Sequence, residues 1–346
     1  MRYISLFSGI GGLEHRSIKP THYAEIEPIA AGYLAKSGVD VISDVTKFSP
    51  PAAEAVVGGW PCQDISIAGK QAGLAGARSG LFYQLVRIAK ESKANTIIGE
   101  NVPNLLKLNG GQEKAKVEQT LQSEGFTHIE WRILNARQFG LPHHRSRVFV
   151  IASKDPKIAR ALQRPIGGQS QTVDSPKASG FYWTAGTQSI CFSTGYLPTI
   201  KVGSGLSIPS PPAVFFDGVV RKVTAAECLS VQGFDSAAFA DIKPQHIFRM
   251  AGNAVTKPVG HWVLDSLNGW DGDLDPTSPT LATNLDAFID FNNRIPMSQR
   301  AASGLLRRLQ KSQKKIPADL RAALVSIAGS PSAPTGITPI CPTTPS

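Results

Sequence analysis

The stretch YISLFSGIGG, residues 3–12, joins a short β-rich run to a glycine-rich turn. Glycines in such a turn let the backbone bend tightly and approach a ligand closely. Two further candidate strands follow: the second strand of the chain ends in Glu25, 16 positions after Gly9, and Asp44 follows the third. Because the carboxyl ends of parallel strands meet at one edge of a sheet, these residues together predict a nucleoside-binding crevice. Glu25 is suited to ribose hydroxyls, Asp44 to an adenine amino group, and Ile26 to packing on the adenine face.

The first 150 residues alternate runs of β-forming residues with runs of helical character. This alternation predicts an α/β fold in which a mainly parallel sheet carries helices on both faces. The candidate strands are Tyr3–Phe7, Thr21–Ile26, Val39–Ser43, Ala55–Gly58, Asn95–Gly99, His128–Leu134 and Arg147–Ala152, and the candidate helices are Pro28–Ser37, Leu81–Ser92 and Gln112–Ser123.

The composition of the chain changes after about residue 155. Residues 165–215 are rich in Gly, Ser, Thr and Pro, with isolated aromatic residues, which is typical of a small, loop-rich, partly β module. Helical patterns then return. Thr224 and Glu227 have the spacing of a capping box at a helix start, and a further helix is predicted over Val255–Leu267.

The segment from Asp271 onward looks like an appendage. It contains an amphipathic pair of predicted helices, Ser298–Lys311 and Pro317–Ala328, with Pro317 near the start of the second helix. The last residues, Ser330–Ser346, are rich in Pro, Thr and Ser, and we expect them to be disordered.

Basic residues are concentrated in two segments of a chain whose formal net charge is +10. Residues 131–164 carry eight Lys and Arg against Asp155 alone, and residues 294–321 carry another eight against Asp319 alone. Such clusters fit a polyanionic partner, because neutralising phosphates releases counterions. A solvated basic face would have the same composition, so charge alone leaves both interpretations open.

The four cysteines, Cys62, Cys191, Cys228 and Cys341, lie far apart and form no CxxC pair. This spacing favours reduced thiols in a cytoplasmic protein over a disulfide framework or a zinc site. No apolar stretch reaches the roughly 18 residues that a membrane-spanning helix needs, and the N-terminal residues lack the features of a signal peptide. We therefore expect no metal and no membrane partner.

Three further motifs carry groups capable of chemistry. Cys62 follows the rigid Pro61 and precedes a glycine-rich loop suited to closing over a substrate. A cysteine alone is more often a buried small hydrophobe than a nucleophile, so this prediction rests on its context. Glu100 ends a buried apolar run, where a carboxylate is costly unless it is paired or functional. Arg145 and Arg147 precede the next predicted strand and can hold an oxygen or a phosphate.

In this order, the motifs resemble those of the DNA (cytosine-5) methyltransferase family of the bacterial or phage restriction-modification type. The resemblance covers roughly residues 1–268. The residues that carry it are Phe7–Gly12; Pro61-Cys62-Gln63; Glu100-Asn101-Val102; Gln138–Pro142 leading to Arg145 and Arg147; Arg221–Thr224 with Glu227-Cys228 and then Gly233-Phe234; and Gly252–Val255. The family implies a Rossmann-like sheet with a small target-recognition domain, S-adenosyl-L-methionine as methyl donor, and double-stranded DNA as substrate.

The resemblance also implies how these residues act. The target cytosine is flipped out of the duplex, because its reacting atoms lie inside the stack. Cys62, as a thiolate, attacks C6, and Glu100, with a raised pKa, holds the cytosine edge and supplies a proton while C5 takes the methyl group. Arg147 is the expected contact to the cytosine O2, and Arg145 is expected nearer the Cys62 loop or a phosphate. Asn101 is expected to brace the turn before the cysteine.

Binding residues follow from the same resemblance. The cofactor residues lie at strand ends or in a late segment that must pack beside the first strand, and they are Phe7, Ser8, Gly9, Gly11, Gly12, Glu25, Ile26, Asp44, Asn253 and Val255. The expected DNA contacts are Gln63, Ser66 and Thr199. Thr199-Ile200 resembles the family's recognition dipeptide, and Thr172-Val173 is a rival for that role.

The resemblance implies four parts of the chain. They are a catalytic and cofactor-binding domain (1–154), a target-recognition domain (155–217), a return to the catalytic domain (218–269) and a partly helical, basic extension (270–346). The extension has no counterpart in the family core, and DNA contact, oligomerisation and a solvated surface all stay open for it. We expect a monomer, with a cognate restriction endonuclease as a functional rather than a physical partner.

Other protein classes explain fewer of the motifs. A nicotinamide dehydrogenase would use the glycine turn and a strand-end acid, but it leaves Cys62, Glu100 and the arginine pair without a role. A cysteine hydrolase would pair Cys62 with His143, yet no third residue orients that histidine. A non-catalytic DNA-binding relative is disfavoured while Cys62, Glu100 and Arg147 are all intact. An RNA cytosine-5 methyltransferase of the same fold is the nearest rival.

Overall fold

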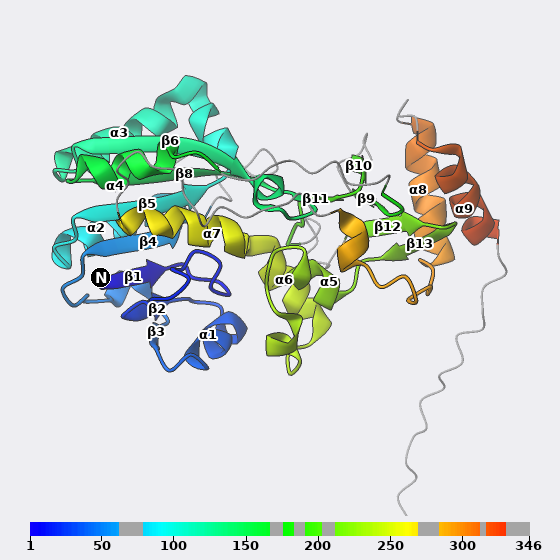
Figure 1. The fold of residues 1–346 in the computed structure, drawn as a ribbon, viewed down its shortest axis with the longest axis horizontal. Coiled ribbons are helices and arrows are strands. Elements are labelled where there is room, and N and C mark those ends of the chain that lie inside the picture. Colours follow the sequence, from blue (N-terminus) through cyan, green and yellow to red (C-terminus); the bar gives the residue numbers. More distant parts are fainter. Residues whose placement is uncertain are drawn as a thin grey trace, which may run out of the picture.

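The computed structural model describes residues 1–61, 79–166, 176–182, 191–202, 212–268, 284–311 and 316–329. Its larger sheet has seven strands in the order β3-β2-β1-β4-β5-β8-β6 (Figure 1). They are β1 (Tyr3–Leu6), β2 (His22–Ala24), β3 (Asp40–Ile42), β4 (Ala55–Gly59), β5 (Thr96–Asn101), β6 (His128–Asn135) and β8 (Ser146–Ser153). Strand β8 is antiparallel to both of its neighbours, and the other pairs are parallel. The predicted mainly parallel sheet is confirmed.

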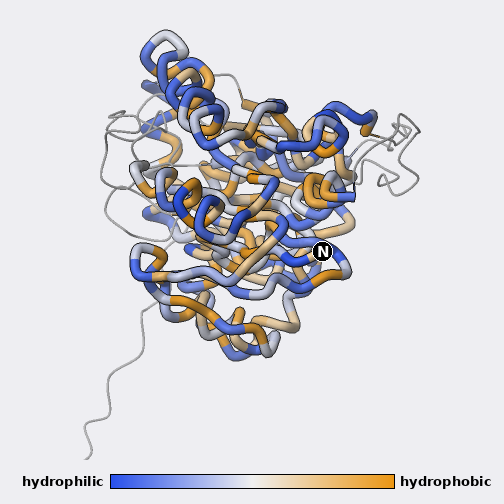
Figure 2. Tube along the Cα trace, turned by 90° about the vertical axis from the view of Figure 1, so that its left-hand side faces the viewer, coloured by the Kyte–Doolittle hydropathy of each residue, from blue (hydrophilic) through white to orange (hydrophobic). Residues whose placement is uncertain are grey.

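Helices cover both faces of this sheet, because successive side chains of a strand point to opposite sides. In β1, Ile4 shares a hydrophobic cluster with Leu85 of α2, whereas Tyr3 shares another with Trp262 of α7. The helices around the sheet are α1 (Pro28–Ala35), α2 (Phe82–Glu91), α3 (Gln112–Ser123), α4 (Pro156–Arg160) and α7 (Lys257–Leu264). Figure 2 shows outer helical turns that alternate between hydrophilic and hydrophobic, as expected for helices with one buried stripe.

Two more helices join the larger sheet to the rest of the molecule. Helix α5 (Ala225–Ser230) begins with the predicted capping box, in which Glu227 N donates to Thr224 Oγ1 and Thr224 N donates to Glu227 Oε2. Helix α6 (Pro244–Asn253) was not predicted, although Pro244 at its first position is a common start signal. It ends at Asn253, the first residue of the late segment that the sequence assigns to the cofactor pocket.

A smaller antiparallel sheet has the strand order β10-β9-β12-β13. Its strands are β9 (Ser179–Tyr182), β10 (Cys191–Thr194), β12 (Ala213–Phe216) and β13 (Val219–Lys222). A two-stranded parallel ladder, β7 (His143–His144) with β11 (Leu197–Pro198), connects the segment before β8 to the segment after β10. The smaller sheet therefore forms within the loop-rich region that the change in composition marks, and β13 extends it beyond residue 217.

The described residues after 283, which the sequence suggested as an appendage, pack onto this smaller sheet. Helices α8 (Gln299–Lys311) and α9 (Ala318–Gly329) match the predicted amphipathic pair. Leu305 and Leu320 are buried in one cluster with Phe181 of β9. An amphipathic helix must bury its apolar stripe, and one face of the smaller sheet supplies the surface. The helical pattern in the sequence does not identify that partner.

The first residues of the predicted 155–217 module pack with the larger sheet instead. Ala159 of α4 and Leu162 lie in the same hydrophobic cluster as Tyr3 and Trp262. The change in composition therefore precedes the structural transition by about one short helix. Within the described residues, no helix combines the length and the apolar character needed to cross a membrane.

Candidate active site

The larger sheet brings the chain up to the predicted nucleophile at the end of β4. After Gly59 the chain continues through Trp60 to Pro61, and β4 pairs with β5 so that Gly59 lies opposite Glu100. Cys62, Gln63 and Ser66 lie outside the described residues. The residue that directly precedes Cys62 is thus held at the strand ends where Glu100 lies.

Glu100, which is buried, and the partly buried Arg147 form an ion pair at these strand ends. Arg147 Nε donates to Glu100 Oε1 at 3.0 Å, and Glu100 is 8% exposed. Burial raises the pKa of Glu100, and the neighbouring guanidinium groups of Arg147 and Arg145 oppose that rise. A Cβ on Gly59 would lie 2.6 Å from Glu100 Oε2, so a glycine is required beside the carboxyl group. A carboxyl group in this setting is suited to holding a transferable proton.

Asn101 follows Glu100 in β5 and supports the turn before Cys62. Its Nδ2 donates to Trp60 O at 3.1 Å, and its Oδ1 accepts from Val102 N at 2.8 Å. The side chain is buried, so both bonds satisfy groups that water does not reach. These contacts agree with the expected bracing role, which stays a prediction as far as the reaction is concerned.

Arg145 points into the protein interior. It is 2% exposed, and it donates from Nη1 to Ile200 O and from Nη2 to Gly252 O, both at 3.1 Å. A buried guanidinium group is costly without acceptors, and backbone carbonyls supply them here. The bonds join two segments that are distant in the sequence, and they favour a structural role over the expected position near the Cys62 loop or a phosphate.

The glycine turn after β1 adopts left-handed backbone conformations. The φ angles of Phe7, Gly9 and Gly11 are 55°, 56° and 80°, a region that glycine occupies at no steric cost. Gly9 N donates to Glu25 Oε2 at 2.7 Å, and Glu27 N donates to Glu25 Oε1 at 2.8 Å. The carboxylate of Glu25 is thus fixed beside the turn, and each oxygen keeps a second acceptor site that fits a ribose hydroxyl.

The late segment of the catalytic domain packs directly against this turn. A Cβ on Gly12 would lie 2.0 Å from Val255 O, and a Cβ on Gly260 would lie 1.9 Å from Gly12 O. Val255 also shares a hydrophobic cluster with Leu13. Ala254 shares another cluster with Ile10, so Val255 and Ala254 lie beside the turn that follows β1. Only glycine at positions 12 and 260 permits so close an approach.

Two side chains at successive strand ends fit the adenosine part of a nucleoside ligand. Ile26 is 79% exposed, and an exposed apolar side chain beside the fixed Glu25 offers a surface for an adenine ring. Asp44 Oδ1 accepts from Thr46 N at 3.0 Å and from Thr46 Oγ1 at 2.7 Å. These bonds lower the pKa of Asp44, which stays an acceptor for an amino group.

Glu14 is a buried acid near the turn that the sequence-based site does not include. It is 7% exposed, and its Oε1 accepts from Ser5 Oγ at 3.0 Å, while Ser5 Oγ lies 2.9 Å from Ser8 Oγ. Within the described residues its Oε2 has no hydrogen-bond partner. Burial raises the pKa of Glu14 to about 8. The sequence did contain a signal for this residue, because Glu14 directly follows the glycine-rich, apolar stretch Gly9–Leu13.

His143 is a second residue whose role was not predicted, because the sequence suggested it only as the partner of Cys62 in a cysteine hydrolase. Its side chain is fully buried, and its Nε2 accepts from Ile200 N at 3.1 Å, while Thr199 Oγ1 donates to His144 O at 2.7 Å. Burial holds the pKa of His143 well below its usual value, so the imidazole is neutral and able to accept. The two histidines therefore anchor the predicted recognition dipeptide. Its rival, Thr172-Val173, lies outside the described residues.

No group of three or more His, Cys, Asp and Glu side chains arranged to hold a metal ion is found in the ranges that the structure describes.

The sequence of this chain matches a family model and several known proteins. Residues 1–189 match the family model described as C-5 cytosine-specific DNA methylase. The Type II methyltransferase M2.BsuMI of Bacillus subtilis is 35% identical over 334 residues, which cover 88% of this chain and 86% of that protein. The Type II methyltransferase M.MspI of a Moraxella species is 29% identical over 286 residues, 75% of this chain and 68% of that protein.

Solved structures share the fold at lower identity. The Dnmt2 methyltransferase of S. pombe has a TM-score of 0.53 at 17% identity and covers 77% of this chain and 97% of its own. The methyltransferase EhMeth of Entamoeba histolytica has a TM-score of 0.51 at 15% identity, with the same shares of 77% and 97%. These likenesses confirm the predicted fold class.

Proposed function

The chain belongs to the family of C-5 cytosine-specific DNA methylases, and from this membership we propose that Cys62, Glu100 and Arg147 carry out its reaction. The enzyme is a DNA cytosine-5 methyltransferase of a family that uses S-adenosyl-L-methionine. The family model and the relatives describe DNA methyltransferases, so the alternative of an RNA substrate is not favoured.

The proposed reaction begins with a cytosine flipped out of the duplex, which exposes C6 to the enzyme. The Cys62 thiolate adds to C6 while protonated Glu100 donates to N3 and Arg147 donates to O2, so that C5 becomes electron-rich. S-adenosyl-L-methionine supplies the methyl group that C5 takes up. A base from solvent then removes the C5 proton, and its bonding electrons form the C5–C6 double bond as the bond between C6 and the Cys62 sulfur breaks. N3 returns its proton to the Glu100 carboxylate, which restores the acid.

The ion pair of Glu100 and Arg147 is the observation on which this proposal rests. Burial raises the pKa of the Glu100 carboxyl group, which favours the protonated form that the reaction needs. Arg147 supplies fixed donors beside it, and the end of β4 carries Pro61 to the same strand ends. Glu100, Arg147 and the residue before Cys62 thus lie at one edge of the sheet. This combination supports a cytosine methyltransferase over a dehydrogenase or a cysteine hydrolase.

The crevice around the glycine turn supports the cofactor assignment. We assign the ribose to Glu25, the adenine to Ile26 and Asp44, and the remaining part of the cofactor to the turn Phe7–Gly12 and the segment Asn253–Val255. The fixed Glu25 carboxylate and the exposed Ile26 side chain fit a nucleoside without rearrangement of either residue. The close contact of Gly12 with Val255 supports one continuous pocket.

The biological role that we propose is protection of host DNA in a restriction-modification system. The relatives are named Type II methyltransferases, which supports methylation of a short, defined sequence and a functional link to a cognate restriction endonuclease. We further propose that the enzyme acts as a monomer in the cytoplasm, where its DNA substrate lies.

A methyl-transfer assay tests this proposal. The enzyme is incubated with labelled S-adenosyl-L-methionine and mixed genomic DNA beside Cys62→Ser, and the DNA is then sequenced after bisulfite treatment. We expect label only with the wild type, at cytosines within one short motif. Label that enters transfer RNA and not DNA would overturn the substrate assignment, and equal activity of Cys62→Ser would overturn the mechanism.

A further inference from the structure

The smaller sheet is packed between helices on both of its faces (Figure 1). On one face Val214 and Phe216 of β12 share a cluster with Cys228 of α5 and Ala251 of α6. On the other face Phe215 lies in the cluster formed with α8 and α9. Without α8 and α9 this second apolar face would be open to solvent, so the helix pair completes the core of the sheet.

Residues 284–297, here called the strap, lead from one end of the smaller sheet to its outer strand. At the start of the strap, the two carboxylate oxygens of Asp286 accept from Lys177 N at 2.9 Å and from Ala178 N at 2.8 Å, directly before β9. At its end, Met297 N donates to Val220 O of the edge strand β13 at 2.9 Å. The strap thereby fixes the first residues of one strand and covers the open edge of another.

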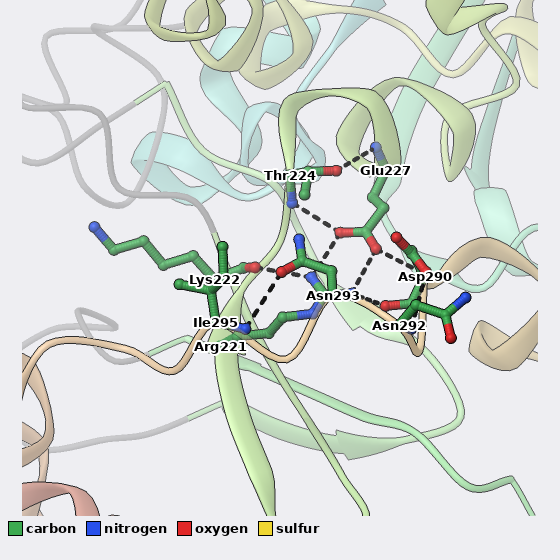
Figure 3. A network of polar contacts seen from close by, with 8 residues as sticks. All are labelled: Arg221, Lys222, Thr224, Glu227, Asp290, Asn292, Asn293 and Ile295. Carbon is green, nitrogen blue, oxygen red and sulfur yellow. Dashed lines mark hydrogen bonds and ion pairs between the residues drawn. The ribbon is translucent and has the colours of Figure 1, made fainter.

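The middle of the strap is anchored by a buried ion pair (Figure 3). Arg221 at the end of β13 donates to both carboxylate oxygens of Glu227 in α5, at 2.9 and 2.6 Å. Asp290 N donates to Glu227 Oε1 at 2.8 Å, and Arg221 Nη2 donates to Asp290 O at 2.9 Å. Three segments distant in the sequence thus meet at one bidentate pair, whose geometry fixes their relative orientation.

The strap also packs beneath the predicted recognition dipeptide. Leu285 and Ile289 share a hydrophobic cluster with Ile200, and all three are buried. Leu285 N donates to Gly195 O, and the chain runs from Gly195 directly to Thr199 four residues later. Ile200 is in turn bonded to the catalytic side through His143 and Arg145. Two sets of contacts therefore fix the position of Thr199-Ile200: the bonds to His143 and Arg145, and the packing against the strap.

From these contacts we propose that residues 284–311 and 316–329, which form the strap with α8 and α9, are a positioning element for DNA recognition. They hold the smaller sheet and the Thr199-Ile200 segment in the orientation that reads the target sequence. The cofactor crevice is built by the turn Phe7–Gly12, Glu25 and the segment after α6, so we expect cofactor binding to depend on the positioning element less than recognition does. This inference rests on the proposed function, because it takes Thr199 as a DNA contact.

Two substitutions in the full chain test the positioning element at separate points. Asp286→Ala removes the acceptors for Lys177 N and Ala178 N, and Leu305→Ala loosens α8 on the sheet. Asp241→Ala is the matched control, since Asp241 forms an exposed ion pair with Lys36 in the catalytic domain. The affinity for S-adenosylhomocysteine is measured by calorimetry. Fluorescence anisotropy measures the affinities for two duplexes, one with the target motif and one with a scrambled sequence. The motif is first identified with the wild type by bisulfite sequencing.

We expect both variants to bind S-adenosylhomocysteine within about twofold of the wild type and the motif duplex about tenfold more weakly, as for lost hydrogen bonds or packing. The ratio of the affinities for the motif duplex and the scrambled duplex should fall with the affinity for the motif duplex. Asp286→Asn should have an affinity for the motif duplex between those of the wild type and Asp286→Ala. The control should have the same affinities as the wild type. An unchanged preference in both variants, or an equal loss of cofactor binding, would overturn the inference. A wild type that methylates no DNA motif would overturn the proposed function as well.

Discussion

The two sheets obtain their covering helices from very different distances along the chain. The larger sheet is covered in good part by helices that lie between its own strands, such as α2 between β4 and β5 and α3 between β5 and β6. The smaller sheet is completed by α8 and α9, which come after the whole catalytic domain. Alternation of strands and helices is visible in a sequence, whereas the partner of a distant amphipathic helix is not.

The same difference distinguishes the residues assigned to methyl transfer from those assigned to DNA recognition. The groups assigned to chemistry, Glu100 and Arg147, lie at the ends of adjacent strands, and local pairing brings them together. The groups assigned to recognition depend on contacts between residues more than 50 positions apart, such as that of His143 with Ile200. Changes in the first region are expected to alter chemistry alone, and changes in the second to alter recognition alone.

The largest expected effect comes from Glu100→Gln, which keeps the shape of the side chain and removes its transferable proton. We expect single-turnover methyl transfer to fall by roughly 10²–10⁴-fold, the usual contribution of a general acid. Because burial raises the pKa of Glu100, the wild-type rate should also fall as pH rises through that pKa. Glu100→Gln should lose this dependence, since glutamine does not ionise.

The readout that sharpens the comparison is binding rather than rate. Glu100→Gln should retain the wild-type preference for the target motif, and Glu130→Gln, in β6 of the same sheet, serves as the control for both measurements. A loss of motif preference in Glu100→Gln would mean that chemistry and recognition are not separable at this edge of the sheet.

A smaller effect is expected where the turn after β1 packs against the distant segment at Val255. Gly12→Ala places a methyl group 2.0 Å from Val255 O, and overpacking of this kind costs about 1–3 kcal/mol. We expect a lower midpoint of thermal unfolding together with weaker S-adenosylhomocysteine binding. Gly32→Ala in α1 is the control, because nothing lies within 4 Å of its added Cβ, and it should stabilise by roughly 0.5–1 kcal/mol. Equal effects of both substitutions would contradict the close packing.

Much of the larger sheet follows from its sequence because local rules agree there. Each predicted strand from Tyr3 to Ala152 is found within a few residues of its expected bounds, and Gln112–Ser123 is found as predicted. The turn at Gly9 and the acid at Glu25 meet because consecutive parallel strands end at one edge. Composition and periodicity are sufficient where the interacting residues belong to neighbouring elements.

The rest was not predictable because it depends on which surfaces meet. Arg145 and Arg147 are two residues apart and look equivalent in the sequence, yet one donates to Ile200 O and Gly252 O and the other to Glu100. The basic pattern of α8 suggested a solvated or DNA-binding helix, while its apolar stripe covers Phe181. These outcomes follow from the packing of distant segments, which a single sequence does not contain.

The smallest effect is expected from Glu14→Gln and depends on pH. Glu14 has a pKa of about 8 in the folded protein and an ordinary value of 4.5, so between these limits the folded state holds a proton that the unfolded state has released. Stability from this group is complete below the unfolded pKa and is lost as pH rises toward 8. Glu14→Gln removes that loss while Ser5 Oγ keeps its acceptor. Its stability relative to wild type should rise by at most about 1.4 kcal/mol per pH unit.

Urea unfolding of both proteins at pH 5.5 and pH 7.5 measures this difference, with Asp241→Asn as the control. Its hydrogen bond from Lys36 lowers the pKa of Asp241, so that group gains its stabilising effect above its unfolded pKa and loses it only in stronger acid. The control difference should therefore stay constant between the two pH values. A constant difference for Glu14→Gln as well would mean that Glu14 is ionised in the folded protein. The acid beneath the glycine turn would then have a cationic or solvent partner, and the larger sheet would depend at this point on a contact that its sequence did not predict.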